Sequence, residues 1–185
     1  MRADSHKGVE IVSDSAKILV VDDLPVNVEF LQDELTSRGF AVFSASDGEQ
    51  ALQLLVQVQP DLLLLDVSMP KLDGIGVLKA LRADDEYRDL PVILLTARRD
   101  SENKIEGLDA GADDYITKPF RVEEVVARIR SLLRMRQIQA DVFEKEKRLA
   151  RVETLRQTLG TLSHHINNAT QAILAIVDPD VVGAE

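Results

Sequence analysis

Four consecutive leucines between two aspartates, Asp61-Leu-Leu-Leu-Leu-Asp66, form the feature that most constrains how this chain folds. A strand with one face in water alternates apolar and polar residues, whereas this run is apolar at every position. It therefore predicts a strand covered on both faces, as the strands of a parallel sheet between two layers of helices are. Residues 17–22 and 91–96 are further apolar runs of the same kind.

Strand and helix signals alternate around these runs. We predict strands at residues 17–22, 41–43, 61–66, 91–96 and 114–117, helices at 25–38, 48–58, 74–82 and 101–107, and a long helix from about Arg121. Pro25 opens the first helix and Gly39 caps its end, the usual asymmetry of helix termini. The pattern predicts an α/β fold, a flavodoxin-like doubly wound five-stranded parallel sheet in the order 2-1-3-4-5, with a long C-terminal coiled-coil or bundle helix.

The charge of the chain is negative and unevenly distributed. Residues 1–120 hold 12 Lys and Arg against 23 Asp and Glu, and residues 121–185 hold 10 against 9. The acidic first part argues against DNA as a partner, because phosphate backbones attract basic surfaces. The longest apolar run is too short to cross a bilayer and the N-terminus lacks the apolar core of a signal peptide, so we expect a cytoplasmic protein with no membrane partner.

Acidic residues stand at the ends of two predicted neighbouring strands. Asp22 and Asp23 follow the first strand, and Asp66 ends the third. The carboxyl ends of these strands meet at the switch in strand order, where such folds bind ligands. Converging carboxylates repel one another unless a cation lies between them, and oxygen ligands with room for water suit Mg²⁺.

Two further polar residues follow the fourth and fifth strands, Thr96 and Lys118. Around a metal-bound carboxylate they would form a phosphoryl site, in which Asp66 attacks phosphorus and becomes an acyl phosphate. Lys118 and the metal would neutralise charge on the transferred group, and Thr96 would donate a hydrogen bond to it. Each residue alone has a simpler explanation, since an Asp at a strand end is usually a turn or N-cap residue. Five such residues at four strand ends favour the phosphoryl site.

The region from about residue 17 to 133 resembles the receiver domain of two-component response regulators. The motifs that carry the resemblance are Val20-Val-Asp-Asp23, Leu65-Asp-Val-Ser-Met-Pro70 followed by Asp73-Gly74, Leu95-Thr-Ala97, Gly107-Leu-Asp-Ala-Gly-Ala112 and Asp114-Tyr-Ile-Thr-Lys-Pro-Phe120. The resemblance implies phosphorylation of Asp66 by a histidine kinase or a phosphotransfer protein, with Lys118 and Thr96 binding the phosphoryl group. It implies Mg²⁺ ligation by Asp23, Asp66 and the backbone carbonyl of Ser68, with Asp22 holding a metal-bound water.

The resemblance also implies a switch between two states. Tyr115 matches the aromatic switch residue, which turns inward as Thr96 moves toward the phosphate. The peptide bond between Lys118 and Pro119 would be cis by analogy, and cis bonds are essentially restricted to X-Pro. Ser68 and Arg98 stand where such domains tune dephosphorylation.

A heptad pattern runs through the C-terminal helix. Its apolar residues are spaced 3,4,3,4,3,4,3 and are Val152, Leu155, Leu159, Leu162, Ile166, Ala169, Ile173 and Ile176. An apolar stripe upstream, from Met135, changes phase near Val152. The pattern predicts a coiled-coil or bundle seam, and homodimerisation is the simplest way to bury it.

His164 falls outside this seam, at the outermost position of the heptad, where an imidazole in water can accept or donate a phosphoryl group. The segment Leu162-Ser-His-His-Ile-Asn-Asn168 resembles the H-box on the first helix of histidine kinase dimerisation domains, with His164 as a candidate second phosphorylation site. His165 departs from that pattern, because kinases commonly carry an acid there. The alternative is a solvated histidine on a coiled coil.

The organisation that follows is a tail at residues 1–15, a receiver domain at 16–133, a dimerising helix at 134–178 and a tail at 179–185. The leading hypothesis is a phosphorelay protein whose receiver catalyses its own phosphoryl transfer to Asp66 and passes the signal to the helix. Alternatives are the N-terminal part of a receiver-containing histidine kinase autophosphorylated on His164, an ATP-independent phosphotransfer adaptor, and a pure dimerising scaffold. Kinase activity would require the chain to continue into an ATP-binding domain.

Overall fold

The computed structural model describes residues 16–97 and 106–177, without the side chains of His164 and residues 175–177. The two expected tails, Arg98 and most of the helix expected at 101–107 lie outside the described residues. Residues 106–109, at the end of that expected helix, are helical.

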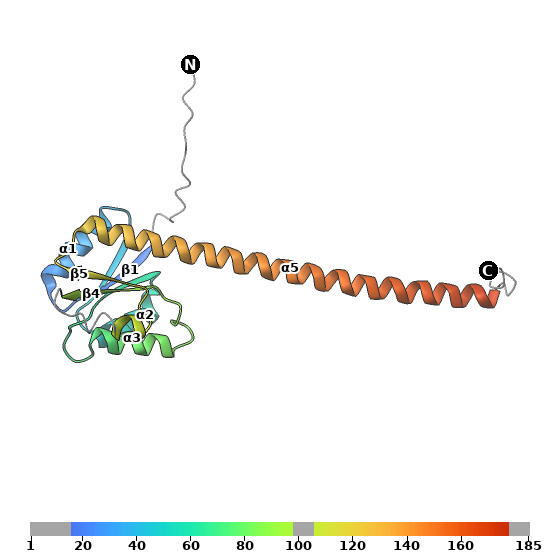
Figure 1. The fold of residues 1–185 in the computed structure, drawn as a ribbon, viewed down its shortest axis with the longest axis horizontal. Coiled ribbons are helices and arrows are strands. Elements are labelled where there is room, and N and C mark those ends of the chain that lie inside the picture. The colour runs from blue at the N-terminus through green and yellow to red at the C-terminus, as the bar shows by residue number, and fades with distance from the viewer. Residues whose placement is uncertain (1–15, 98–105, 178–185) are drawn as a thin grey trace, which may run out of the picture. The chain divides into compact units, whose positions relative to one another are not determined.

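The predicted parallel sheet is confirmed. Five strands pair in parallel in the order β2-β1-β3-β4-β5. Figure 1 shows this sheet with the helices around it. Their bounds are β1 Lys17–Val21, β2 Ala41–Ala45, β3 Leu62–Asp66, β4 Val92–Ala97 and β5 Asp114–Lys118. Each strand lies within one or two residues of its predicted range. The sheet therefore brings the carboxyl ends of β1 and β3 side by side, with Val21 paired to Leu65.

Helices cover both faces of the sheet, which explains the run of leucines. Leu63 and Leu65 point into a core shared with α2 (Gly48–Val58) and α3 (Gly74–Ala83). Leu62 and Leu64 point the opposite way, into a core shared with α1 (Pro25–Thr36) and the start of α5 (Val122–Val177). All four side chains are fully buried.

The first helix ends slightly before its predicted limit. The last helical residue is Thr36 and the C-cap is Ser37, while Gly39 follows in the left-handed region at a φ of +89°. Gly39 N–H donates to the Thr36 carbonyl at 3.0 Å and Phe40 N–H to that of Leu35 at 3.2 Å. This is the Schellman arrangement, which needs a residue that tolerates positive φ.

The chain divides into two compact units, Met1–Arg136 and Gln137–Glu185. In the first unit, the start of α5 packs into the core through Val125, Val126 and Ile129. In the second unit, α5 continues as a helix whose large apolar side chains are exposed. Among the described residues, no helix is long and apolar enough to span a membrane.

Candidate functional site

Three carboxylates gather at the carboxyl ends of β1 and β3. Asp22, Asp23 and Asp66 each place one oxygen within 4.8 Å of the others. Asp22 and Asp66 are buried and Asp23 is partly buried. The convergence expected from the strand order is therefore present, and the backbone pairing of β1 with β3 produces it.

Lys118 supplies the positive charge of the cluster. Its Nζ lies 2.7 Å from Asp22 Oδ2 and 3.0 Å from Asp66 Oδ1. Lys118 ends β5, and β4 lies between that strand and β3, so the long side chain reaches across a strand to the acids. The following bond to Pro119 is cis, as the resemblance implied.

Asp22 has further partners that the sequence did not predict. Asn27 Nδ2 lies 3.0 Å from both carboxylate oxygens of Asp22, and the backbone N–H of Leu24 donates to Oδ1 at 3.0 Å. Asn27 stands in the first turn of α1, so Pro25, which opens that helix, also sets its position. The sequence offered no signal for this role, because Asn27 is an ordinary polar residue at the start of an amphipathic helix. These contacts hold the Asp22 side chain in one orientation.

Thr96 lies at the end of β4 and is fully buried. Its hydroxyl has no hydrogen-bond partner within the part of the chain that the structure describes. A buried hydroxyl without a partner costs about 1–3 kcal/mol, so such a group needs an explanation. An acceptor that arrives with a ligand at the adjacent acidic cluster provides one.

The environment of Asp66 opposes its ionisation. Burial raises the pKa of its carboxyl above the usual 3.8, and the charge of Asp22 adds to the effect. The hydrogen bond and charge of Lys118, together with the backbone N–H of Ser68, lower the pKa but do not offset burial. A buried carboxylate in this state gains from an added cation, and the oxygen-only donor set suits Mg²⁺.

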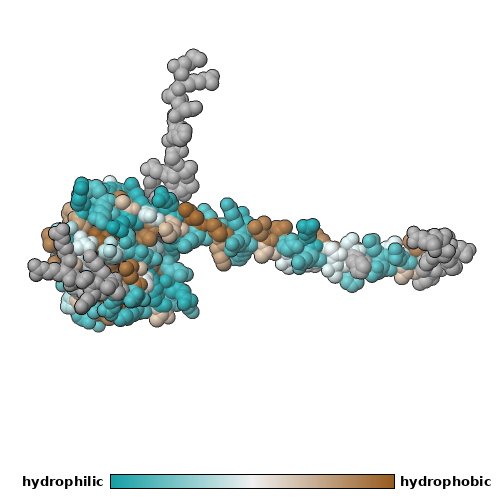
Figure 2. Space-filling view, viewed as in Figure 1, coloured by the Kyte–Doolittle hydropathy of each residue, from teal (hydrophilic) through white to brown (hydrophobic). Residues whose placement is uncertain are grey.

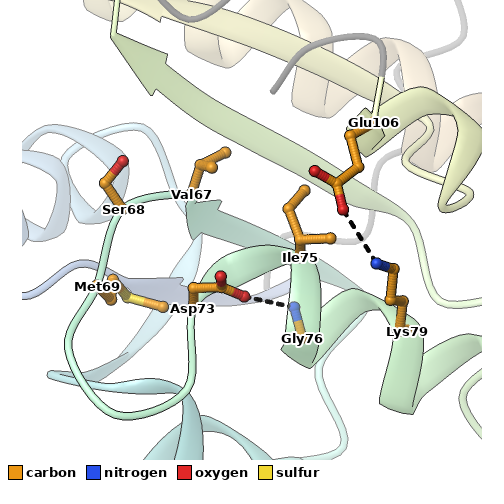
Figure 3. A pocket seen from close by; sticks show the side chains of 8 residues that line it. All are labelled: Val67, Ser68, Met69, Asp73, Ile75, Gly76, Lys79 and Glu106. Atoms are coloured by element: carbon orange, nitrogen blue, oxygen red, sulfur yellow. Dashed lines mark hydrogen bonds and ion pairs between the residues drawn. The ribbon is translucent and has the colours of Figure 1, made fainter. Parts of the chain in front are cut away.

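The loop between β3 and α3 borders the cluster. A hollow of about 550 Å³ lies along this loop and the start of α3. Its lining residues are Val67, Ser68, Met69, Asp73, Ile75, Gly76, Lys79 and Glu106. Figure 3 shows two contacts along its rim: Asp73 caps α3 by accepting from Gly76 N–H at 2.7 Å, and Lys79 Nζ lies 3.0 Å from Glu106 Oε1. Ser68 stands two residues after Asp66 on this loop, and the metal-ligand role of its carbonyl stays a prediction.

The structure also gives the backbone positions of the two remaining candidate residues, Tyr115 and His164. Tyr115 lies on β5 opposite Leu94 and packs against the core under α2 and α3. Thr96 pairs with Thr117 two residues further along, so the two residues of the expected switch stand on adjacent strands. His164 lies within α5, but its side chain is outside the described residues. The switch role of Tyr115 and phosphorylation of His164 stay predictions.

Comparison with known proteins identifies the first unit. The model of the response regulator receiver domain matches residues 18–130, which include the acidic cluster, Thr96 and Lys118. The chain belongs to the response regulator receiver family. The fold expected from the resemblance is thereby confirmed, and the helix resembling an H-box lies beyond the matched residues.

Relatives share this region. The chain is 48% identical over 118 residues to the DNA-binding dual master transcriptional regulator RpaA of Synechocystis, covering 64% of this chain and 49% of that protein. It is 46% identical over 127 residues to the response regulator MprA of Mycobacterium ulcerans, covering 69% and 54%. The chain thus spans about half the length of these relatives.

Solved receiver structures agree with the fold. Chemotaxis protein CheY4 of Vibrio cholerae superposes with a TM-score of 0.61 at 31% identity, covering 64% of this chain and 98% of that one. The signal receiver domain of a signal transduction histidine kinase from Syntrophus aciditrophicus gives 0.61 at 35% identity, covering 64% and 89%.

Proposed function

We propose that this protein accepts a phosphoryl group on Asp66 from a histidine kinase or a phosphotransfer protein in the cytoplasm. The observation that carries the proposal is the cluster of Asp22, Asp23 and Asp66 bridged by Lys118, beside the buried hydroxyl of Thr96. These groups supply a nucleophile, a cation and a hydrogen-bond donor at one place. Phosphoryl transfer depends mostly on positioning and on stabilising charge, and this arrangement provides both.

The acidic cluster also fits a divalent cation. We infer that Asp23, Asp66 and the backbone carbonyl of Ser68 hold Mg²⁺, and that Asp22 holds a water bound to it. When bound, Mg²⁺ supplies positive charge that offsets the repulsion among the carboxylates and the charge of the phosphoryl group. Asn27 and Lys118 keep Asp22 oriented for this role.

The reaction at Asp66 is then a displacement at phosphorus. An Oδ atom of Asp66 forms the new bond to phosphorus while the bond between phosphorus and the imidazole nitrogen of the donor breaks. Lys118, already 3.0 Å from Asp66, stabilises negative charge on the phosphoryl oxygens. Thr96 donates its hydroxyl, which has no partner among the described residues, to one of those oxygens.

Phosphorylation by a small donor tests this proposal directly. The full chain incubated with acetyl phosphate and MgCl₂ is expected to gain one phosphoryl group, measured by intact mass spectrometry. Excess EDTA should abolish the gain, because the cation is required to offset the charge of the site. The gained group should be lost at alkaline pH, as an acyl phosphate is. Phosphorylation that is unchanged in EDTA, or that is mapped to a hydroxyl residue, would contradict the proposal.

We further propose that the second unit is the output, a helix that pairs with a second copy of the chain. Figure 2 shows apolar side chains at the surface along this part of α5. On the heptad seam, the exposed fraction is between 52% and 65% for Val152, Leu155, Leu159, Leu162, Ile166 and Ile173. A single helix leaves such a stripe in water, and a parallel or antiparallel coiled coil buries it. Phosphorylation would then act by shifting populations of dimer geometry.

A charge placed in the seam should disrupt this dimer. Leu159→Glu is expected to weaken self-association at least tenfold, about 1.4 kcal/mol, because a buried leucine is replaced by a desolvated charge in both copies. Sedimentation equilibrium over a concentration series measures the effect.

Gln157→Glu is the matched control for the seam, since Gln157 lies on the outermost face of the same heptad. This variant should associate like the unmodified chain. Equal weakening by both substitutions, or a wild-type chain that is monomeric throughout the series, would exclude the proposed seam.

A second candidate function is kept for the helix around His164. The Syntrophus receiver belongs to a histidine kinase, so receivers related to this one do occur in kinases. In this alternative His164 is autophosphorylated within a longer kinase, or exchanges phosphate with a receiver without ATP. Acid-labile phosphate on a histidine of the chain, delivered from a phosphorylated receiver, would favour the adaptor, and label from ATP on the chain would favour the kinase.

DNA binding is named for the Synechocystis relative but is not proposed for this chain. The match covers only about half of that protein, and residues 1–120 here carry an excess of acids. Acidic surfaces repel the phosphate backbone, so we expect no DNA binding by this part of the chain.

A further inference from the structure

We propose that Lys71 is a positioning residue for the metal site, acting through an ion pair with Asp47 that holds the loop between β3 and α3. The inference rests on the proposed function, in which the backbone carbonyl of Ser68 on this loop is a metal ligand. Neither Lys71 nor Asp47 belongs to the acidic cluster or to the motifs that predicted it. The ion pair instead connects the loop to α2, an element that contributes no residue to the cluster.

The base of this loop is closed by its own backbone. Gly74 N–H donates to the Val67 carbonyl at 3.0 Å, and the Asp73 side chain caps the first turn of α3. A Cβ atom on Gly74 would lie 2.2 Å from the Asp66 carbonyl oxygen, so the loop returns directly onto the end of β3. These contacts fix the two ends of the loop, and the residues between them need a separate anchor.

Lys71 provides that anchor at the far side of the loop. Its φ of +66° lies in the left-handed region, which costs about 1–2 kcal/mol for a residue with a Cβ atom. Its Nζ forms an ion pair and hydrogen bond with Asp47 Oδ2. A strained backbone persists only where surrounding contacts hold it, and the contact with Asp47 holds Lys71 through its side chain.

Asp47 is suited to form this ion pair because its side chain is already fixed by a hydrogen bond to α2. It is the N-cap of α2 and accepts from Gln50 N–H at 2.9 Å through Oδ1, which leaves Oδ2 for Lys71. The contact with Lys71 and the bond from Gln50 lower the pKa of Asp47, so the carboxylate is charged at neutral pH.

The loop also touches the start of α2 directly. A Cβ atom on Gly48 would lie 2.5 Å from the Leu72 carbonyl oxygen, so only glycine lets the two backbones approach this closely. Helix α2 is packed into the core through Ala51 and Leu55. Lys71 stands three residues after Ser68. Its ion pair therefore ties this part of the loop to α2, which is a rigid element.

Removal of the Lys71 side chain should change the Mg²⁺ affinity in opposite directions, depending on whether Lys71 acts through its charge or by positioning the loop. Removing a positive charge near an acidic site should strengthen Mg²⁺ binding if charge alone matters. Removing the anchor should weaken it, because contacts that orient a ligand typically change metal affinity by about 10- to 100-fold. The sign of the change therefore separates the two explanations.

The test measures Mg²⁺ affinity of the full chain at fixed ionic strength, by following amide chemical shifts during titration with MgCl₂. Lys71→Ala and Asp47→Asn are each expected to weaken binding roughly tenfold. Asparagine keeps the N-cap, so α2 should remain intact. The double variant should be no weaker than either single variant, because both remove the same ion pair. Lys71→Arg should restore most of the affinity.

Lys79→Ala is the matched control. Lys79 has a similarly exposed side chain, 61% against 58% for Lys71, and it also forms one ion pair with an acid. Its loss should leave Mg²⁺ affinity unchanged or slightly tighter. Thermal unfolding without metal should shift little for all variants. If the wild-type chain binds Mg²⁺ and Lys71→Ala binds it equally or more tightly, this inference alone is overturned. If the wild-type chain does not bind Mg²⁺, the proposed function is overturned as well.

Discussion

Asp66→Asn is expected to reduce phosphoryl incorporation from acetyl phosphate to background. The amide has no carboxylate oxygen to attack phosphorus, and it removes one ligand from the proposed metal site. Intact mass spectrometry after incubation with MgCl₂ measures the loss. Asp61→Asn is a matched control on the same segment, since Asp61 lies just before β3 and binds the Lys17 N–H at 2.8 Å, away from the acidic cluster. Phosphorylation of the Asp66 variant at a normal rate would refute the assignment.

The same substitution should preserve the fold, because the folded state favours the neutral form of Asp66. The pKa of Asp66 is raised above 3.8 in the folded chain, mainly by burial, so the folded state holds its proton to higher pH than the unfolded state. In the absence of metal, ionisation of Asp66 therefore lowers stability as pH rises from 3.8 through the raised pKa.

Asp66→Asn removes that loss. Its gain in stability over the wild-type chain is expected to be absent below pH 3.8 and complete above the raised pKa. Urea unfolding in EDTA, followed by circular dichroism across this window, measures the difference. A gain that shrinks with rising pH would mean that the folded state favours the ionised carboxylate, the opposite of the expected result.

Gly74→Ala is expected to produce a large loss of stability, about 3 kcal/mol or more, at the upper end of the usual range for overpacking. The added Cβ would lie 2.2 Å from the Asp66 carbonyl oxygen and 2.9 Å from Val67 Cα. Both are backbone atoms of β3 and the loop after it, so relief requires the strand end itself to move. Urea unfolding measures the loss, and reduced phosphorylation should accompany it because Asp66 is displaced.

Gly160→Ala is the control for this effect. Gly160 lies within α5, and a Cβ atom there would meet nothing within 4 Å. Alanine is favoured over glycine inside a helix by about 1 kcal/mol, so helical content should rise while the receiver transition is unchanged. A Gly74 variant that unfolds at the wild-type urea concentration would show that the loop can move away from the strand end.

Much of the fold followed from local pattern. The unbroken leucines of β3 required two covered faces, and the alternation of strands with helices then required parallel pairing. The strand order alone placed Asp22, Asp23 and Asp66 at one edge of the sheet. Thr96 and Lys118 were found in the same way, as polar residues that follow apolar strands.

Contacts between segments that are distant in the sequence could not be predicted in this way. Asn27 looked like an ordinary polar residue of an amphipathic helix, and only its distance to Asp22 gives it a role. Lys71 and Asp47 are 24 residues apart, and nothing in either segment indicates that they meet. Ion pairs of this kind depend on how a loop leaves the sheet, which varies with a few backbone angles such as the positive φ of Lys71.

The sequence by itself determined the periodicities, and therefore the strands, the helices and the edge at which the acids collect. These follow from which side chains avoid water, a property that each residue carries wherever it stands. Only the tertiary structure decided that Lys118 reaches across β4 to two carboxylates, that the hydroxyl of Thr96 is left without a partner among the described residues, and that Lys71 ties its loop to α2. Hydrogen bonds and ion pairs depend on distances of a few ångströms, and those distances exist only after the elements have packed.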